Sequence, residues 1–272
     1  MMSKRFTFAF FILLAVSAAL IGQVTAPTVP VKGNMSPAET ARIVKAFTTN
    51  EGAFREALTL YAFNRSATIN TIGLGGNITG TYRRDSYMTF TQAGERFEKI
   101  VFFPMPSTEP GLVTAEDLED MGGVNPFALE PSAVDKYNFS FIGNEKIDGL
   151  NLYVFEVTPK VIPDPKKSKL RLFTGRVWVD QEDLLIVKSK GKGVPETKVN
   201  KFPIFETWRE NVDGKYWFPS YSSSDDELVF DNGAVLKLKI RIKFTNYRVG
   251  RSEVRILDDD PTPTPSPTPI KP

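Results

Sequence analysis

The chain has 272 residues, 41% of them hydrophobic and 12% aromatic, which is enough to bury the core of one globular domain or two small ones. It contains no Cys and no His, which excludes disulfide scaffolds, zinc fingers, thiol catalysis and every catalytic triad built on imidazole. The formal net charge is +2, and it falls to zero once Lys4 and Arg5 are removed with the leader described next, so nucleic acid is not an expected partner.

Residues 1–26 have the three parts of a secretory signal peptide. Lys4 and Arg5 precede an apolar run over 6–21, and the small-residue approach Val24-Thr25-Ala26 follows. The run is shorter than the ~20 apolar residues of a comfortable membrane span, so a cleaved signal is favoured over a retained anchor. Because an exported protein without Cys is typical of a bacterial envelope, we expect a periplasmic or otherwise extracytoplasmic location.

One amphipathic helix with a kink, or two short helices, is predicted over 37–63. Ser36 is a suitable N-cap, Pro37 fits the first helical position, and Glu39 is placed to close a capping box. Apolar residues then recur at helical spacing, and they are Ile43, Phe47, Phe54, Leu58 and Tyr61.

From Ala67 onward the hydrophobic period is two, which is typical of an all-β domain. Strands are predicted near 67–73, 79–92 with an interruption at Asp85, 95–103, 136–143, 151–158, 173–180, 184–190, 204–212, 215–223 and 227–247. Ala93-Gly94 and Asp213-Gly214 are predicted hairpin turns. The acidic stretch 114–121 is predicted to be a short helix inserted between strands, and Arg83 and Arg84 are interpreted as solvated charges at a strand end.

The last hairpin, around Asp231-Asn232-Gly233, allows two registers. A two-residue loop would place Leu228 opposite Lys237. A three-residue loop with a bulge instead pairs Phe230 with Leu236, and we prefer it because it sorts apolar and charged side chains onto opposite faces. The inward row is then Leu236, Leu238, Ile240, Ile242 and Phe244, and the outward row is Lys237, Lys239, Arg241 and Lys243.

Aromatic and aliphatic side chains gather on single faces of several predicted strands. A long antiparallel sheet with few helical turns to cover it can either pack solid or leave an apolar hollow. The residues predicted to line such a hollow, and to contact lipid there, are Met88, Phe90, Tyr137, Phe139, Phe141, Tyr153, Phe155, Leu238, Ile240 and Ile242. No catalytic residue, metal ligand or cofactor is predicted.

Two blocks of the sequence resemble the outer-membrane lipoprotein-sorting family, of LolA-like fold. The first is KYNFSFIGNEKIDG at 136–149, followed by YVFEVTPK at 153–160, and the second is FTGRVWVD at 173–180, followed by LIVK at 185–188. The resemblance covers roughly 36–248. It implies an unclosed β-barrel lidded by helices, whose hollow holds acyl chains or senses mislocalised envelope components.

We therefore expect a mainly β (α+β) domain over 36–257, a half-open antiparallel barrel covered by an N-terminal helix and a short inserted helix. Residues 258–272, with proline at alternate positions, are predicted to be a disordered tail. The first functional hypothesis is a non-enzymatic carrier or sensor of lipid or lipoprotein acyl chains. The second is a module with a filled core that binds an envelope protein.

A carboxylate-dependent hydrolase is a third hypothesis. Glu206 and Glu210 flank Trp208, but four residues of strand span ~13 Å, whereas a glycosidase pair of carboxylates lies ~5 to 9.5 Å apart. These two residues are therefore interpreted as part of a solvated face. The basic loop at 166–171 is either a solvated charge run or a contact to anionic headgroups at a membrane surface.

Overall fold

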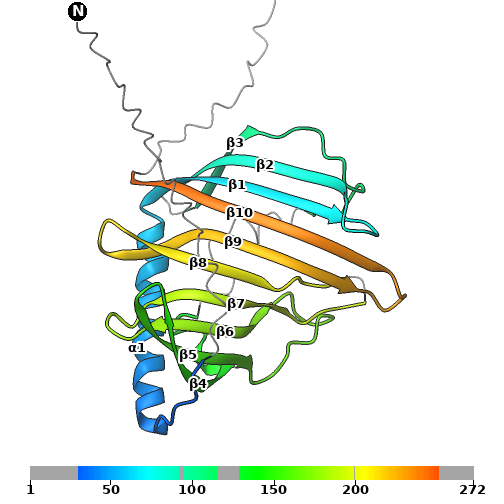
Figure 1. The fold of residues 1–272 in the computed structure, drawn as a ribbon. Helices are drawn as coiled ribbons and strands as arrows, with labels where there is room; N and C mark the ends of the chain where they lie inside the picture. Colours follow the sequence, from blue (N-terminus) through cyan, green and yellow to red (C-terminus); the bar gives the residue numbers. More distant parts are fainter. Residues whose placement is uncertain (1–29, 92–94, 115–128, 199, 251–272) are drawn as a thin grey trace, which may run out of the picture.

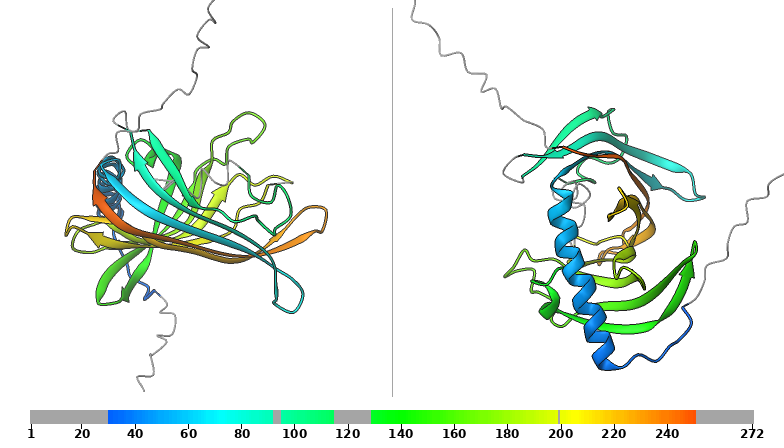
Figure 2. Two further views of the ribbon diagram at one scale, coloured as in Figure 1. Left: turned by 90° about the horizontal axis from the view of Figure 1, so that it is seen from above. Right: turned by 90° about the vertical axis from the view of Figure 1, so that its left-hand side faces the viewer.

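The computed structural model describes residues 30–91, 95–114, 129–198 and 200–250, which form one ten-stranded antiparallel sheet and one α-helix (Figure 1). The strand order is β3-β2-β1-β10-β9-β8-β7-β6-β5-β4, so the first strand pairs with the last and the edges β3 and β4 do not meet. The sheet curves into a half-open barrel, and the helix crosses its inner, concave face (Figure 2). The predicted fold class is confirmed, and the predicted inserted helix lies outside the described residues.

The elements follow the chain from the helix to the last strand. Their bounds are α1 Pro37–Leu58, β1 Tyr61–Ile72, β2 Ile78–Phe90, β3 Arg96–Phe102, a 3-10 turn at Val134–Lys136, β4 Tyr137–Ile147, β5 Leu150–Pro159, β6 Leu172–Asp180, β7 Ile186–Val194, β8 Phe205–Val212, β9 Tyr216–Val229 and β10 Val235–Val249. No helix within the described ranges is long and apolar enough to cross a membrane.

The helix begins as predicted and ends earlier than predicted. The Ser36 side chain accepts a hydrogen bond from the Glu39 backbone N–H at 3.1 Å, so the N-cap is confirmed. Helix α1 is one element that ends at Leu58, and the predicted continuation to residue 63 is wrong. Tyr61 opens β1 instead, because pairing with β10 gives this segment a ladder of hydrogen bonds that a helix end does not offer.

Most predicted strands are confirmed, with differences at several bounds. Strand β1 begins at Tyr61, six residues earlier than predicted, and β9 runs on to Val229 through residues 224–226, where a break between two strands was predicted. Strand β2 runs through Asp85 without interruption, because the Asp85 carboxylate accepts hydrogen bonds from Ser66 at 2.6 Å and Arg83 at 2.7 Å. Strand β7 starts two residues later than predicted, since Leu184 lies in a turn with a φ of 52°. The Asp213-Gly214 turn is confirmed by φ angles of 55° and 67°, and Ala93-Gly94 lies outside the described residues.

The last hairpin has a different register from the predicted one. Its loop is Asp231-Asn232-Gly233, closed by a hydrogen bond from the Phe230 N–H to the Ala234 carbonyl at 2.9 Å. Leu228 therefore pairs with Leu236, a shift of two residues from the prediction. A shift of two preserves the faces, so Leu238, Ile240, Ile242 and Phe244 are buried in the inward row as predicted.

The inner face carries two apolar clusters, joined by the helix. The upper cluster packs against the C-terminal half of α1, and its buried members are Phe54, Ala57, Leu58, Tyr61, Phe63, Ala67, Ile69, Tyr82, Met88, Phe218, Leu228, Leu238, Ile240, Ile242 and Phe244. The lower cluster packs against the N-terminal half, and its buried members are Ile43, Val44, Phe47, Leu129, Tyr137, Phe155, Val157, Leu172, Phe173, Val177, Val179 and Ile186. One amphipathic helix thus covers parts of both halves of the curved sheet.

Candidate functional site

The ten residues predicted to line a hollow all lie on the inner face, but the structure divides them between the two clusters. Met88, Phe90, Leu238, Ile240 and Ile242 belong to the upper cluster, and Tyr137, Phe139, Phe141, Tyr153 and Phe155 belong to the lower cluster. Strand order explains the division, because β2 and β10 lie on either side of β1, whereas four strands separate β10 from β5.

In the lower cluster, aromatic rings fill the space beneath the helix. Phe47 of α1 is fully buried, and its ring centroid lies 5.7 Å from that of Phe139 and 5.7 Å from that of Phe155. The Phe141 ring adds contacts to Phe155 at 5.6 Å and to Tyr153 at 6.1 Å. Rings at these separations make favourable edge and tilted contacts, so this half of the inner face is a packed core under the helix.

A buried ion pair between the two clusters fixes the helix to the middle of the sheet. Glu51 of α1 is 1% exposed and Arg209 of β8 is 4% exposed. The Arg209 guanidinium donates to the Glu51 carboxylate at 2.6 and 3.0 Å and to the Ile186 carbonyl at 3.3 Å. It also lies 4.4 Å from the centre of the Phe54 ring. This bidentate pair sets the position of α1 along the strands.

In the upper cluster, the apolar face continues past the helix. Strands β1, β2 and β10 extend well beyond α1 in Figure 1. Tyr82, Ile69 and Ile240 lie in one cross-strand row on that extension, and Leu238 follows in the next row. All four are buried. The helix is not what buries them, because Phe103 lies 5.4 Å from the Tyr82 ring and Val113 packs against the same cluster. This half of the inner face is therefore an apolar layer that side chains outside α1 cover.

The upper cluster contains a polar group that the sequence patterns did not predict. Arg65, Arg84, Ser86 and Glu98 come from β1, β2 and β3, and all four side chains face inward. Arg84 is therefore not a solvated strand-end charge, because its guanidinium pairs with Glu98 at 2.9 Å and is 15% exposed. The alternation of residues 63, 65, 67 and 69 is the signal that could have placed an arginine on the apolar face.

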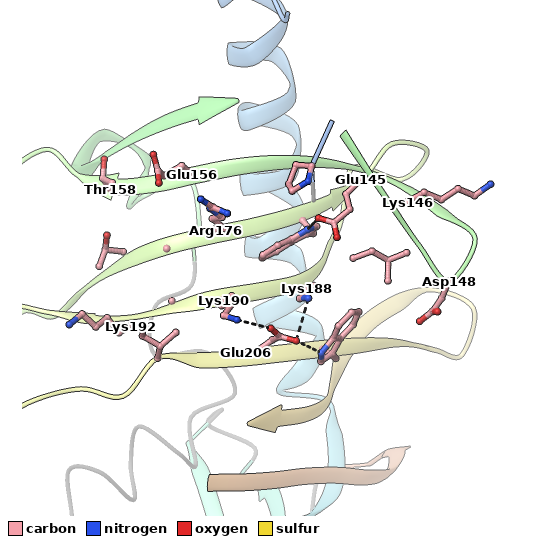
Figure 3. Close-up of a pocket in the computed structure, with 18 residues that line it drawn as sticks. Glu145, Lys146, Asp148, Glu156, Thr158, Arg176, Lys188, Lys190, Lys192 and Glu206 are labelled. Atoms are coloured by element: carbon pink, nitrogen blue, oxygen red, sulfur yellow. Dashed lines mark hydrogen bonds and ion pairs between the residues drawn. The ribbon is translucent and has the colours of Figure 1, made fainter. Parts of the chain in front are cut away.

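The outer face of the sheet carries a groove with a volume of about 780 Å³, which crosses β4 to β8 (Figure 3). The Lys188 ammonium lies over two indole rings, 4.7 Å from the centre of Trp178 and 4.1 Å from that of Trp208. Glu206 forms ion pairs with Lys188 and Lys190 at 3.3 Å each and accepts a hydrogen bond from the Trp208 indole N–H at 3.0 Å. The groove thus combines aromatic surface with a charged lining of five basic and four acidic side chains.

The electrostatics of Glu206 argue against acid catalysis in this groove. Burial acts to raise the pKa of Glu206, but Lys188 and Lys190 outweigh it and hold that pKa below its ordinary value. A general acid needs a raised pKa, and Glu210, the other carboxylate of the predicted pair, is exposed. Glu206 therefore lacks the raised pKa of a general acid.

No protein-family model and no curated protein matches this chain. Solved structures resemble it. A DUF1329 family protein from Desulfovibrio piger is 15% identical, with 77% of this chain and 92% of that chain covered and a TM-score of 0.38. A LolA superfamily protein from Nitrosomonas europaea is 15% identical, with 77% and 93% covered and a TM-score of 0.33.

A domain of a putative outer membrane lipoprotein-sorting protein from Vibrio parahaemolyticus is 12% identical, with 77% and 94% covered and a TM-score of 0.35. The structural neighbours thus include LolA superfamily and lipoprotein-sorting proteins, the family that the two sequence blocks resemble, and a DUF1329 protein. At these identities the likeness concerns the fold alone.

Proposed function

We propose that this protein is an exported, non-enzymatic carrier or sensor of the bacterial cell envelope, which binds acyl chains of a lipid or lipoprotein on the inner face of its curved sheet. The observation that supports the proposal is the apolar layer of the upper cluster beyond α1, formed by Ile69, Leu238, Ile240 and Ile242, which residues such as Val113 cover instead of the helix. Such a surface, concave and mainly apolar with a few polar groups, is the usual form of a ligand site.

The two halves of the inner face have different roles in this proposal. The lower cluster, with Phe47 between Phe139 and Phe155, is the structural half. The upper cluster is the binding half, so Met88, Phe90 and the β10 row are the lipid contacts. The signal-like segment 1–26 supports export to an extracytoplasmic compartment, where such a ligand is available.

A fluorescent fatty acid tests the proposal on the delipidated protein. We expect saturable uptake by the parent chain. Ile240→Trp, which adds bulk to the inner face, is expected to reduce uptake at least tenfold. Lys239→Trp adds the same side chain one residue away on the outer face, where Lys239 is exposed, and is expected to leave uptake unchanged. Circular dichroism checks that both variants are folded.

Native mass spectrometry of the freshly purified chain gives an independent readout without any substitution. A co-purified mass in the range of a lipid supports the carrier. If the folded parent chain neither carries lipid nor takes up the fatty acid, or if both tryptophan variants bind as the parent does, the proposal is wrong.

The outer groove favours a second candidate function, a module that binds an envelope protein. Lys188 and Lys190 share the single carboxylate of Glu206, and the exposed Arg176 lies opposite Lys190 on the neighbouring strand. The groove holds two tryptophans and side chains of both charges, five basic and four acidic, so it is suited to a polar segment of a partner rather than to an acyl chain. Cross-linking in cells with Arg176→Glu and Lys190→Glu tests it. Loss of a specific cross-link with unchanged fatty-acid uptake would establish a separate protein site.

A further inference from the structure

The polar group on the inner face sits beside the apolar surface of the upper cluster. Arg65 of β1 pairs with Ser86 of β2, and the next inward pair along these strands is Ala67 with Arg84. Glu98 of β3 lies opposite Met88, which belongs to the upper cluster. Strand alternation therefore places two guanidinium groups and one carboxylate on the concave face, among buried apolar neighbours.

The hydrogen bonds of this group are unevenly shared. Glu98 accepts from Arg65 at 2.6 Å, from Arg84 at 2.9 and 3.0 Å, and from the Ser86 hydroxyl. Arg65 makes this one side-chain bond, and its Nε and Nη1 atoms are buried without a hydrogen-bond partner in the part of the chain that the structure describes. Its side chain is 1% exposed.

Unsatisfied donors in such a place are costly. A guanidinium has five N–H donors and stays charged in proteins. Each buried donor left unpaired costs ~1 to 3 kcal/mol, and the penalty is larger for a charged group. The free N–H groups of Arg65 therefore call for acceptor oxygens that come from outside the described chain.

The charge of the group specifies the ligand further. Arg65 and Arg84 share the one carboxylate of Glu98, which leaves a net positive charge inside the half-barrel. Arg96, also on β3, adds a like charge that acts on Arg65. An anionic oxygen ligand balances this charge and matches the planar fork of a guanidinium.

A row of mainly apolar residues lies farther along the same strands, where the non-polar part of a ligand would bind. Tyr82, Ile69, Ile240 and Ser224 form one row across β2, β1, β10 and β9. Its two central residues are apolar, and the hydroxyls at its ends, those of Tyr82 and Ser224, are buried without a hydrogen-bond partner in the described ranges. The row lies ~13 Å along β1 from Arg65, at four residues of strand.

We propose that Arg65 and Arg84 bind the anionic head group, a carboxylate or a phosphate, of an amphiphile whose acyl chain lies on the Ile69 and Ile240 row. Glu98 and Ser86 position the two guanidinium groups. This inference rests on the proposed function, which supplies the acyl chain, and adds the chemistry of its head group.

The test compares probes that differ only at the head. Fluorescent parinaric acid and its methyl ester are titrated against the delipidated mature chain. The acid is expected to bind at least tenfold more tightly than the ester. Displacement of the bound acid by hexadecanoate, by hexadecyl phosphate and by hexadecanol then distinguishes the carboxylate source from the phosphate source, with the neutral alcohol as the reference.

Two variants and one control locate the effect. Arg84→Gln is expected to remove most of the preference for the acid over the ester, and Arg65→Gln is expected to do the same if it folds. Arg83→Gln is the matched control, because Arg83 is the neighbouring residue, 49% exposed on the outer face. Its preference is expected to equal that of the parent.

The outcomes separate this inference from the proposed function. Equal binding of the acid and the ester by the parent chain overturns the head-group site and leaves the acyl-chain carrier standing. Binding of neither probe overturns both. A preference for the acid that survives in Arg84→Gln, or is lost equally in Arg83→Gln, also overturns the assignment to the inner face.

Discussion

The buried pair of Glu51 and Arg209 gives the sharpest prediction about stability. Glu51→Gln keeps the shape of the side chain and removes its charge, which leaves the Arg209 guanidinium buried with weakened partners. Both side chains are almost fully buried, at 1% and 4% exposure. Breaking one partner of such a pair costs ~3 to 5 kcal/mol, because an uncompensated charge stays in the interior. We therefore expect a loss of this size in the free energy of unfolding.

Urea denaturation followed by tryptophan fluorescence measures this loss, since Trp178, Trp208 and Trp217 all lie in the sheet. The matched control is Glu39→Gln on the same helix, whose partner Arg42 is 58% exposed. We expect it to change the free energy of unfolding far less than Glu51→Gln, because water screens an exposed pair.

A double variant separates the charge from the packing. Glu51→Met with Arg209→Met removes both charges together, and we expect it to be more stable than either single variant. If Glu51→Gln costs no more than Glu39→Gln, the pair does not hold α1 on the sheet and the reasoning fails.

Burial acts to raise the pKa of Glu98, but Ser86 and its arginine partners outweigh this effect and keep it below the ordinary value. The stability that Glu98 contributes is thus complete above the unfolded pKa of ~4.3 and is lost as the pH falls through the lowered folded pKa. Below about pH 4.5, the melting temperature should therefore fall more steeply with pH for the parent than for Glu98→Gln. Parallel curves would contradict this. In urea denaturation, Gly191→Ala should lower the free energy of unfolding more than Gly233→Ala does. A Cβ on Gly191 would lie 2.5 Å from the Phe173 ring. A Cβ on Gly233 would meet open space, and only its φ of 82° is unfavourable, by ~1 kcal/mol. Equal losses would argue against the close approach at Gly191. Removal of residues 258–272, which lie outside the described residues, should leave the melting temperature unchanged, and a drop of several degrees would show that the domain extends further.

Local patterns were enough to predict the faces of the strands. Leu238, Ile240 and Ile242 alternate with lysine and arginine, and the structure buries the first set and exposes most of the second. The N-cap at Ser36 and the turn at Asp213-Gly214 are equally local, because each depends on one or two residues. Features of this kind need no knowledge of which strands are neighbours.

Pairing between distant strands could not be predicted from the same patterns. The division of the ten lining residues depends on β1 lying beside β10, which no short-range signal encodes. The Arg65 and Glu98 pair joins residues 33 positions apart. The end of α1 could not be predicted for the same reason. Tyr61 fits the helical stripe, but in the structure it belongs to β1 and pairs with Val249 of β10.

The pairing of β1 with β10 affects the order in which the sheet can fold. Strands β1 to β3 and β4 to β10 are two meanders in which each strand pairs with the next, so both can form through short loops. They become one sheet only at the β1–β10 seam, where Ile72 meets Lys237 across about 165 residues of chain. Closing that loop costs ~3.5 kcal/mol more entropy than closing a three-residue hairpin loop. Docking of the two meanders along this seam is therefore expected to limit the rate of folding.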